Sequence, residues 1–114
     1  AVDALSSART KDATSWTVPY NLAVVLSAAG RHDRARQELE EAARRLREFG
    51  NAVGAGGLDT RQATARIRTR LGEVRWRSGD LAGARRDLEF ATELDPAYTR
   101  ARVMINRLVK ATGN

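Results

Sequence analysis

The chain contains an internal repeat, which constrains its fold more than any other feature of the sequence. The segment Leu22–Ala42 aligns without a gap with the segment Leu71–Ala91, at a constant offset of 49 residues. The matching positions are identical or small: Leu22/Leu71, Ala23/Gly72, Gly30/Gly79, Ala35/Ala84, Arg36/Arg85, Leu39/Leu88, Glu40/Glu89 and Ala42/Ala91. Similarity at a fixed period indicates one supersecondary unit that is used more than once.

The first copy has the pattern of two helices separated by a glycine. Leu22, Leu26 and Ala29 form an apolar stripe that stops at Gly30, and Asp33 is predicted to be the N-cap of the next helix. Apolar residues then recur at helical intervals at Ala35, Leu39, Ala42, Leu46 and Phe49. The segment is therefore predicted to form an antiparallel helix pair.

The second copy repeats this pattern. Its first stripe, Ile67, Leu71 and Val74, stops at Gly79, and Asp80 is the predicted N-cap of the following helix. The next stripe consists of Leu81, Ala84, Leu88, Ala91 and Leu94, and it ends at Asp95–Pro96. Upstream, Asp59 and Gln62 are spaced as a capping box, which predicts that the first helix of this pair begins there.

These residues resemble the tetratricopeptide-repeat (TPR) family. The residues Leu71–Gly72, Gly79–Asp80, Ala84, Leu88, Ala91 and Pro96 fall at the spacings of its 34-residue motif, and Leu22–Ala23, Gly30, Ala35, Leu39 and Ala42 match in the first copy. The resemblance implies an all-α fold, in which antiparallel pairs from about five to six helices stack as a right-handed TPR-like solenoid. It also implies a scaffold for protein–protein interaction and not an enzyme.

The same register divides the whole chain. Residues 1–13 correspond to the second helix of a preceding repeat, 16–49 and 59–96 to two repeats, and 97–114 to the first helix of a further repeat or a capping helix. The chain is thus interpreted as a fragment of a longer array. Because the two clear copies are 15 residues farther apart than the motif period, the excess is assigned to a Gly-rich loop at 50–58 and to longer helices on either side of it.

The chain departs from the motif where the family has aromatic residues. Pro19 and Leu26 occupy these positions in the first copy, and Arg68 and Arg75 occupy them in the second. Two arginines at normally buried positions leave two interpretations open. Either this face is open to solvent, or the arginines pair with one of the acidic residues Glu40, Glu41 and Glu48.

Composition restricts the function classes. The chain has no cysteine, which excludes disulfides, thiolate metal sites and cysteine nucleophiles. The apolar run Leu22–Leu26 is too short to cross a bilayer, and no signal-peptide pattern begins the chain, so a cytoplasmic protein without membrane partners is expected. The net charge is +6, with eighteen arginines against two lysines; either a GC-rich genome or affinity for acidic ligands explains this ratio.

The resemblance implies that partners bind along the first helix of each repeat. The candidate partner-binding residues are Tyr20, Asn21, Val24, Arg66, Arg70, Glu73, Trp76, Arg77, Arg100 and Arg107; Thr17, Ser27, Thr69, Val103, Met104 and Lys110 are also expected along this groove. Independently of the family, Arg66, Arg70, Glu73 and Arg77 share one helix face. Guanidinium groups beside a tryptophan favour an acidic peptide with an apolar anchor, although a solvated surface and a core role for Trp76 are the alternatives.

Other binding modes and chemistry find less support. Some TPR domains grip a C-terminal carboxylate with lysine and asparagine, but beside Asn21 the residues Thr17, Arg70 and Met104 do not reproduce that set. His32, expected in an exposed turn, has no nucleophile beside it, and no catalytic residue, metal site or cofactor is predicted. Trp16 is expected to pack near Pro19.

Two further functions remain as alternatives. Nucleic acid could bind the basic second half, where residues 51–114 carry twelve basic and seven acidic side chains, although aromatic residues make up only 5% of the chain. Self-association through open repeat ends is the other, so the oligomeric state stays open. The Arg/Ala-rich style resembles repeat proteins of high-GC actinobacteria, in which such arrays often belong to multidomain regulators.

Overall fold

The computed structural model describes residues 13–50 and 58–113, and all regular elements within these ranges are α-helices. The helices are α2 (Thr17–Ala28), α3 (His32–Phe49), α4 (Thr60–Arg77), α5 (Leu81–Leu94) and α6 (Thr99–Thr112). The all-α prediction is confirmed. The helix predicted in residues 1–13 lies almost wholly outside the described residues, as does most of the Gly-rich segment.

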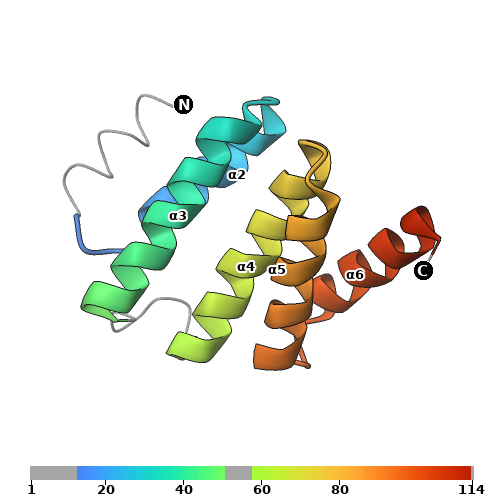
Figure 1. Cartoon of the computed structure of the whole chain (residues 1–114). Coiled ribbons are helices and arrows are strands. Elements are labelled where there is room, and N and C mark those ends of the chain that lie inside the picture. Colours follow the sequence, from blue (N-terminus) through green and yellow to red (C-terminus); the bar gives the residue numbers. More distant parts are fainter. Residues whose placement is uncertain (1–12, 51–57, 114) are drawn as a thin grey trace.

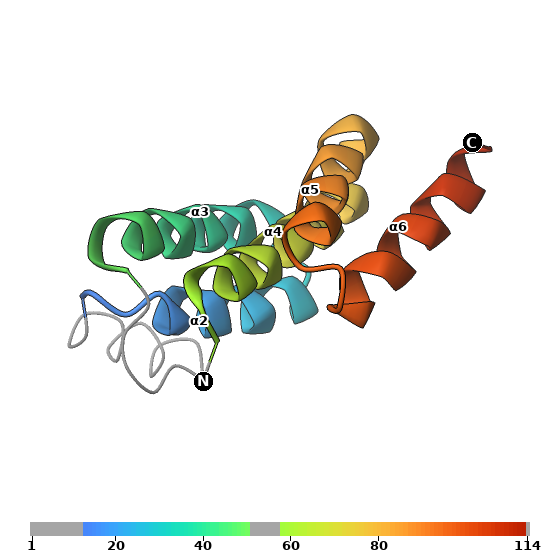
Figure 2. The same ribbon diagram turned by 90° about the horizontal axis from the view of Figure 1, so that it is seen from below.

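The helices form antiparallel pairs that stack side by side. Helix α2 packs on α3, and α4 packs on α5 and also on α3 of the preceding pair. Figure 1 shows the two pairs next to each other, with α6 inclined at the C-terminal end. In the view from below, α3 and α5 lie above α2 and α4 (Figure 2). The first helices α2, α4 and α6 contact one another in succession, which is the arrangement of a TPR-like helical repeat.

The turns inside the two pairs follow the glycine pattern of the repeat. Gly30 has φ +79° and Gly79 has φ +94°, a left-handed conformation that side chains other than glycine rarely adopt. Each glycine follows the last turn of the first helix and lets the chain reverse within three residues. The predicted breaks between helices are therefore confirmed, with a physical reason for glycine at both.

The predicted helix caps are right in two places and wrong in one. Asp59 and Gln62 form the expected capping box: the Gln62 amide donates to Asp59 at 2.7 Å, and the Asp59 amide donates to the Gln62 side chain at 3.0 Å. Asp80 accepts from the Gly83 amide at 2.9 Å. Asp33, however, lies inside the first turn of α3, and the N-cap is Arg31, which provides no side-chain hydrogen bond. An acidic side chain there still interacts favourably with the positive end of the helix dipole.

The core is built from the repeated leucines and alanines. Ala35, Ala42, Ala84 and Ala91 are completely buried, which lets the paired helices approach closely. Gly72 allows the closest approach, because a Cβ atom there would lie 2.8 Å from Cγ of Leu88. Two residues predicted to end the apolar stripes are not buried. Ala29 follows the end of α2 and is exposed, and Phe49, the last residue of α3, is 54% exposed.

Among the described helices, the two on either side of the Gly-rich segment are the longest. Helices α3 and α4 have 18 residues each, against 12 for α2 and 14 for α5. The prediction of lengthened helices is confirmed. They extend the surface on which the two pairs meet.

The arginines at the motif's aromatic positions have a partner that the sequence did not suggest. Asp87 on α5 is 3% exposed, and it accepts from Arg75 at 2.7 Å and from Arg68 at 3.3 Å. Of the acidic residues considered, Glu40 lies 3.9 Å from Arg75. Glu41 and Glu48 instead pair along α3 with its own arginines. A charged cluster thus fills the place of aromatic packing between α4 and α5.

Candidate functional site

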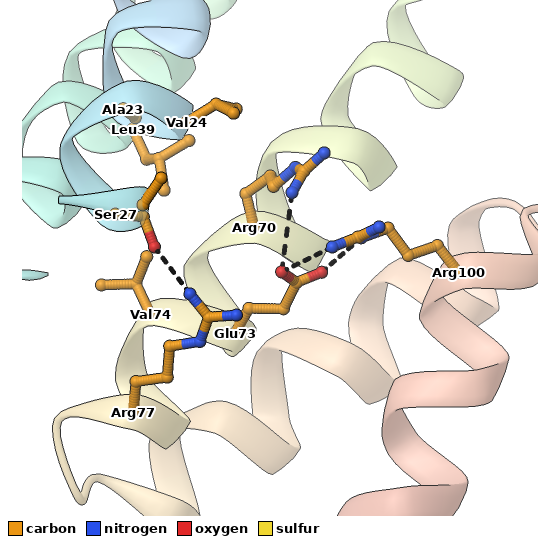
Figure 3. Close-up of a pocket in the computed structure, with 10 residues that line it drawn as sticks. Ala23, Val24, Ser27, Leu39, Arg70, Glu73, Val74, Arg77 and Arg100 are labelled. Atoms are coloured by element: carbon orange, nitrogen blue, oxygen red, sulfur yellow. Dashed lines mark hydrogen bonds and ion pairs between the residues drawn. The ribbon is translucent and has the colours of Figure 1, made fainter. Parts of the chain in front are cut away.

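A hollow between the first helices brings together five of the ten candidate binding residues: Val24, Arg70, Glu73, Arg77 and Arg100. It has a volume of about 180 Å³, and we call it the arginine pocket. Its lining comes from α2, α4 and α6 together with one leucine of α3: Ala23, Val24, Ser27, Ala28, Leu39, Arg70, Glu73, Val74, Arg77 and Arg100. The small and aliphatic residues make its floor, and three guanidiniums with one carboxylate stand around it (Figure 3).

Helix α4 positions the charged groups because one of its faces packs against the neighbouring helices and the other faces the groove. Ile67, Leu71 and Val74 are buried against the neighbouring helices. Arg70 and Arg77, seven residues apart, therefore project from the side that faces α2 and α6. The capping box at Asp59 sets where the helix begins, and so fixes this register along the groove.

Glu73 lies at the centre of the arginine pocket and holds two of its three arginines. Its side chain is 6% exposed. The Arg100 guanidinium on α6 donates to both Glu73 oxygens, with the Nη2 to Oε2 distance at 3.0 Å. Nη1 of Arg70 lies 3.6 Å from the same Oε2. The hydrogen bond to Glu73 raises the pKa of Arg100.

Arg77 is bound differently from the other two arginines. Its Nη1 donates to Oγ of Ser27 at 3.3 Å, across the groove on α2 (Figure 3). Within residues 13–50 and 58–113, Arg77 forms no ion pair, and its side chain is exposed. Its charge is therefore available to an anion, with a serine hydroxyl beside it.

Tyr20 on α2 lines neither hollow but contacts Arg70, which lines the arginine pocket. Its hydroxyl accepts a hydrogen bond from Nε of Arg70 at 3.2 Å. Its ring packs edge-to-face on Trp16, with the ring centres 5.5 Å apart. Trp16 is 4% exposed, which confirms the expected packing role, and the rigid pair orients Arg70 toward Glu73.

A second hollow continues the groove between α4 and α6. Its volume is about 350 Å³, and its lining is Glu73, Trp76, Arg77, Met104 and Arg107. Trp76 is partly buried against the core around Leu88 and Leu108, but one part of it faces this hollow. The expected core packing of Trp76 is thus present in part, and the side that lines the hollow forms an apolar wall next to the arginine pocket.

Some candidate residues lie away from both hollows. Arg66 stacks over the ring of Tyr98, with its Cζ atom 4.0 Å from the ring centre, and burial raises the pKa of the Tyr98 hydroxyl. Asn21 is exposed on α2 but lines neither hollow. Thr69 was wrongly expected in the groove: it is completely buried, and its hydroxyl donates to the Ala65 carbonyl at 2.8 Å.

The sequence did not reveal the contact between Glu73 and Arg100. The two residues are 27 positions apart on separate helices, and both were expected on the same groove without a link. The register of the repeats places both on first helices. Whether their side chains meet depends on the angle between α4 and α6, which no local pattern contains.

Other chemistry finds no support in the part of the chain that the structure describes. His32 is not in a turn but begins α3, where it is half-buried. Among the described side chains, no cluster of three or more His, Asp or Glu could hold a metal ion. No described helix combines the length and apolar character needed to cross a membrane.

Comparisons with known proteins give a fold and no close relative. Neither sequence models of known families nor curated proteins match the chain. Among solved structures, the chain is similar to the first TPR of Spaghetti (RPAP3), bound there to the HSP90 peptide SRMEEVD. The TM-score is 0.77 at 18% sequence identity, over 99% of this chain and 78% of the other. The chain therefore has the fold of a TPR domain.

Proposed function

We propose that the chain is a protein-binding module whose groove along α2, α4 and α6 binds an acidic segment with an apolar side chain. The observation that carries this proposal is the position of Arg77, an exposed guanidinium without an ion pair among the described residues, between two hollows. A carboxylate at Arg77 and Ser27 would form charge-assisted hydrogen bonds. An adjacent apolar side chain would pack against Trp76 and Met104.

The structural neighbour supports this choice of ligand class. A domain of the same fold binds a peptide that contains acidic residues beside methionine and valine. The same chemistry could come from a separate protein or from another segment of a larger regulator that contains this chain. Both sources present a carboxylate and an apolar group on an extended chain.

The proposal is tested with a synthetic peptide of known acidity. Fluorescence anisotropy is measured with two labelled peptides that carry an amidated C-terminus: the acidic peptide SRMQEVN, which has one carboxylate, and SRMQQVN, which has none. We expect the acidic peptide to bind at least about tenfold more tightly, since a charge-assisted hydrogen bond contributes roughly 1.5–3 kcal/mol. Arg77→Gln should remove most of this difference.

The control is Arg86→Gln, which removes one exposed guanidinium from α5, outside both hollows. Equal affinities of the Arg77→Gln and Arg86→Gln variants for SRMQEVN would mean that only the overall charge attracts the peptide. Absence of binding by the wild-type chain to both peptides would contradict the proposed function.

Nucleic-acid binding is the second candidate, and the ion pairs of the second half oppose it. Arg68, Arg70, Arg75, Arg85 and Arg100 all form ion pairs with acidic side chains. These pairs lower the positive charge offered to a phosphate backbone, although six other arginines of this half form no ion pair among the described residues. A labelled single-stranded RNA in the same assay, at rising salt, distinguishes this candidate, because its binding would fall steeply with salt concentration.

A further inference from the structure

Glu73 is the acidic side chain in the lining of the arginine pocket, and it is nearly inaccessible to solvent. It sits where a carboxylate ligand of the groove would be expected, between the guanidiniums of Arg70 and Arg100. The two contacts with Arg100 form a bidentate pair, the strongest geometry by which an arginine binds a carboxylate. Glu73 is therefore paired with two of the three arginines that line the pocket.

We propose that Glu73 is an internal competitor that sets the specificity of the groove, a role that rests on the proposed function. By holding Arg70 and Arg100, it directs the ligand's carboxylate to Arg77 and Ser27. The groove then accepts one acidic group next to an apolar one, and it discriminates against segments with several neighbouring acidic residues.

The charges of the pocket give the physical reason. Three arginines and one glutamate line it, so its net charge is +2, and a single ligand carboxylate is attracted. A second ligand carboxylate would have to approach Arg100 or Arg70 and would meet the buried charge of Glu73. Like charges at such short range in a partly desolvated site repel strongly.

A purely structural role for Glu73 predicts different behaviour. The pair with Arg100 also ties α6 to α4, so a loss of this tie alone would loosen the groove and weaken every ligand. Glu73→Gln separates the two roles, because the amide keeps the size of the side chain and one acceptor oxygen but removes the charge.

The experiment compares two amidated peptides by fluorescence anisotropy. One, SRMEEVN, has two neighbouring carboxylates, and the other, SRMQEVN, has one. We expect Glu73→Gln to raise the affinity for the two-carboxylate peptide about tenfold, the effect of one additional charge-assisted contact, and to change the affinity for the one-carboxylate peptide less than about twofold. The matched control is Glu89→Gln, which removes one acidic group from an exposed pair on α5 and should change neither.

A second variant tests the competition directly. In Arg100→Gln, Glu73 keeps its charge but loses its bidentate partner. This variant should therefore bind the two-carboxylate peptide more weakly than the wild-type chain does. The double variant Glu73→Gln/Arg100→Gln should regain affinity for the two-carboxylate peptide. Its affinity should differ by more than about fivefold from the value expected if the two changes acted independently. Helicity of every variant is compared by circular dichroism.

The outcomes separate this inference from the proposed function. If the wild-type chain binds the one-carboxylate peptide and Glu73→Gln leaves the preference between the two peptides unchanged, Glu73 does not compete and only the inference fails. If Glu73→Gln weakens both peptides equally, the residue acts only through packing. If neither peptide binds to the wild-type chain or to the variant, both the inference and the proposed function are wrong.

Discussion

Arg75 on α4 donates a hydrogen bond to Asp87 on α5 at 2.7 Å, and the Asp87 side chain is 3% exposed while that of Arg75 is 24% exposed. Arg68 contacts the other oxygen of the same carboxylate and is 39% exposed. Asp87 is thus a buried carboxylate that pairs with two guanidiniums in contact with water. Burial raises the pKa of Asp87, and the two guanidiniums offset this effect only in part.

Because Asp87 is buried and its arginines reach water, removing Arg75 and removing Asp87 should lower the free energy of unfolding by different amounts. Arg75→Gln leaves a buried carboxylate without its nearest cation, so we expect the free energy of unfolding at pH 7 to fall by about 2 kcal/mol. Asp87→Asn leaves two guanidiniums that solvent can hydrate, and it should cost less than about 1 kcal/mol. Urea denaturation measures both, with Arg85→Gln in an exposed pair as the control. A larger loss in Asp87→Asn than in Arg75→Gln would contradict this view.

The same site has a defined pH dependence. Because the pKa of Asp87 is raised above its ordinary value of 3.8, the folded chain binds a proton there more tightly than the unfolded chain. Its contribution to stability is therefore present at low pH and is lost as the pH rises from 3.8 through the folded-state pKa. Carboxyl NMR titration should find this raised pKa, and Arg75→Gln should raise it further because a neighbouring positive charge is removed.

Glu41 is predicted to act with the opposite sign. Hydrogen bonds from Arg44, and then from Arg45, lower its pKa from 4.5 to about 2. Its contribution is present above pH 4.5 and is lost as the pH falls toward 2. Glu41→Gln should therefore lower the free energy of unfolding by about 0.5–1 kcal/mol at pH 7, the range of partly exposed pairs, and by almost nothing near pH 2. Glu93→Gln, on the exposed side of α5, is the control.

Gly72 is predicted to be required by the contact between α4 and α5. An added Cβ would lie 2.8 Å from Cγ of Leu88 and 3.2 Å from the carbonyl oxygen of Ala84. Overpacking of about 2 kcal/mol exceeds the gain of about 1 kcal/mol in helix propensity, so Gly72→Ala should destabilise the chain by about 1 kcal/mol. In a Leu88→Ala background the added methyl group has space, and the same change should become neutral or stabilising. An equal cost in both backgrounds would rule out this contact as the cause.

The two tryptophans should report on different parts of the molecule. Trp16 is 4% exposed in the core, whereas Trp76 lines the hollow beside Met104. In single-tryptophan variants, Trp76 should be quenched by acrylamide more strongly than Trp16. Addition of the one-carboxylate peptide SRMQEVN should change only the emission of Trp76, as measured in Trp16→Phe, and Trp76→Phe should show no change. A response from Trp16 instead would place the peptide elsewhere or indicate a rearranged core.

The repeat predicted most of the architecture because its residues act locally. The glycines at 30 and 79 permit a left-handed turn without steric cost, and the capping box at Asp59 starts a helix by its own hydrogen bonds. The prediction that Asp33 is an N-cap was wrong, because an acidic residue near the start of a helix can be either the N-cap or a residue of the first turn. Choosing between the two requires the backbone conformation at Arg31.

The candidate site was predicted only as a set of residues on one face. Helical periodicity placed Arg70, Glu73 and Arg77 together on α4, because residues three to four apart share a face in any α-helix. It could not separate the arginines held by Glu73 from Arg77, which forms no ion pair among the described residues. The resemblance to the TPR family placed Thr69 in the groove, although tertiary packing buries that position.

The sequence by itself determined the helices, their breaks and the pairing of small residues, because these depend on backbone preferences and on periodicity within about twenty residues. The tertiary structure decided which charges meet. Arg75 finds Asp87 and Arg100 finds Glu73 only after the helices have docked at particular angles. Ion pairs between helices depend on distances of a few ångströms between side chains far apart in the chain, and stacking of the helices alone sets those distances.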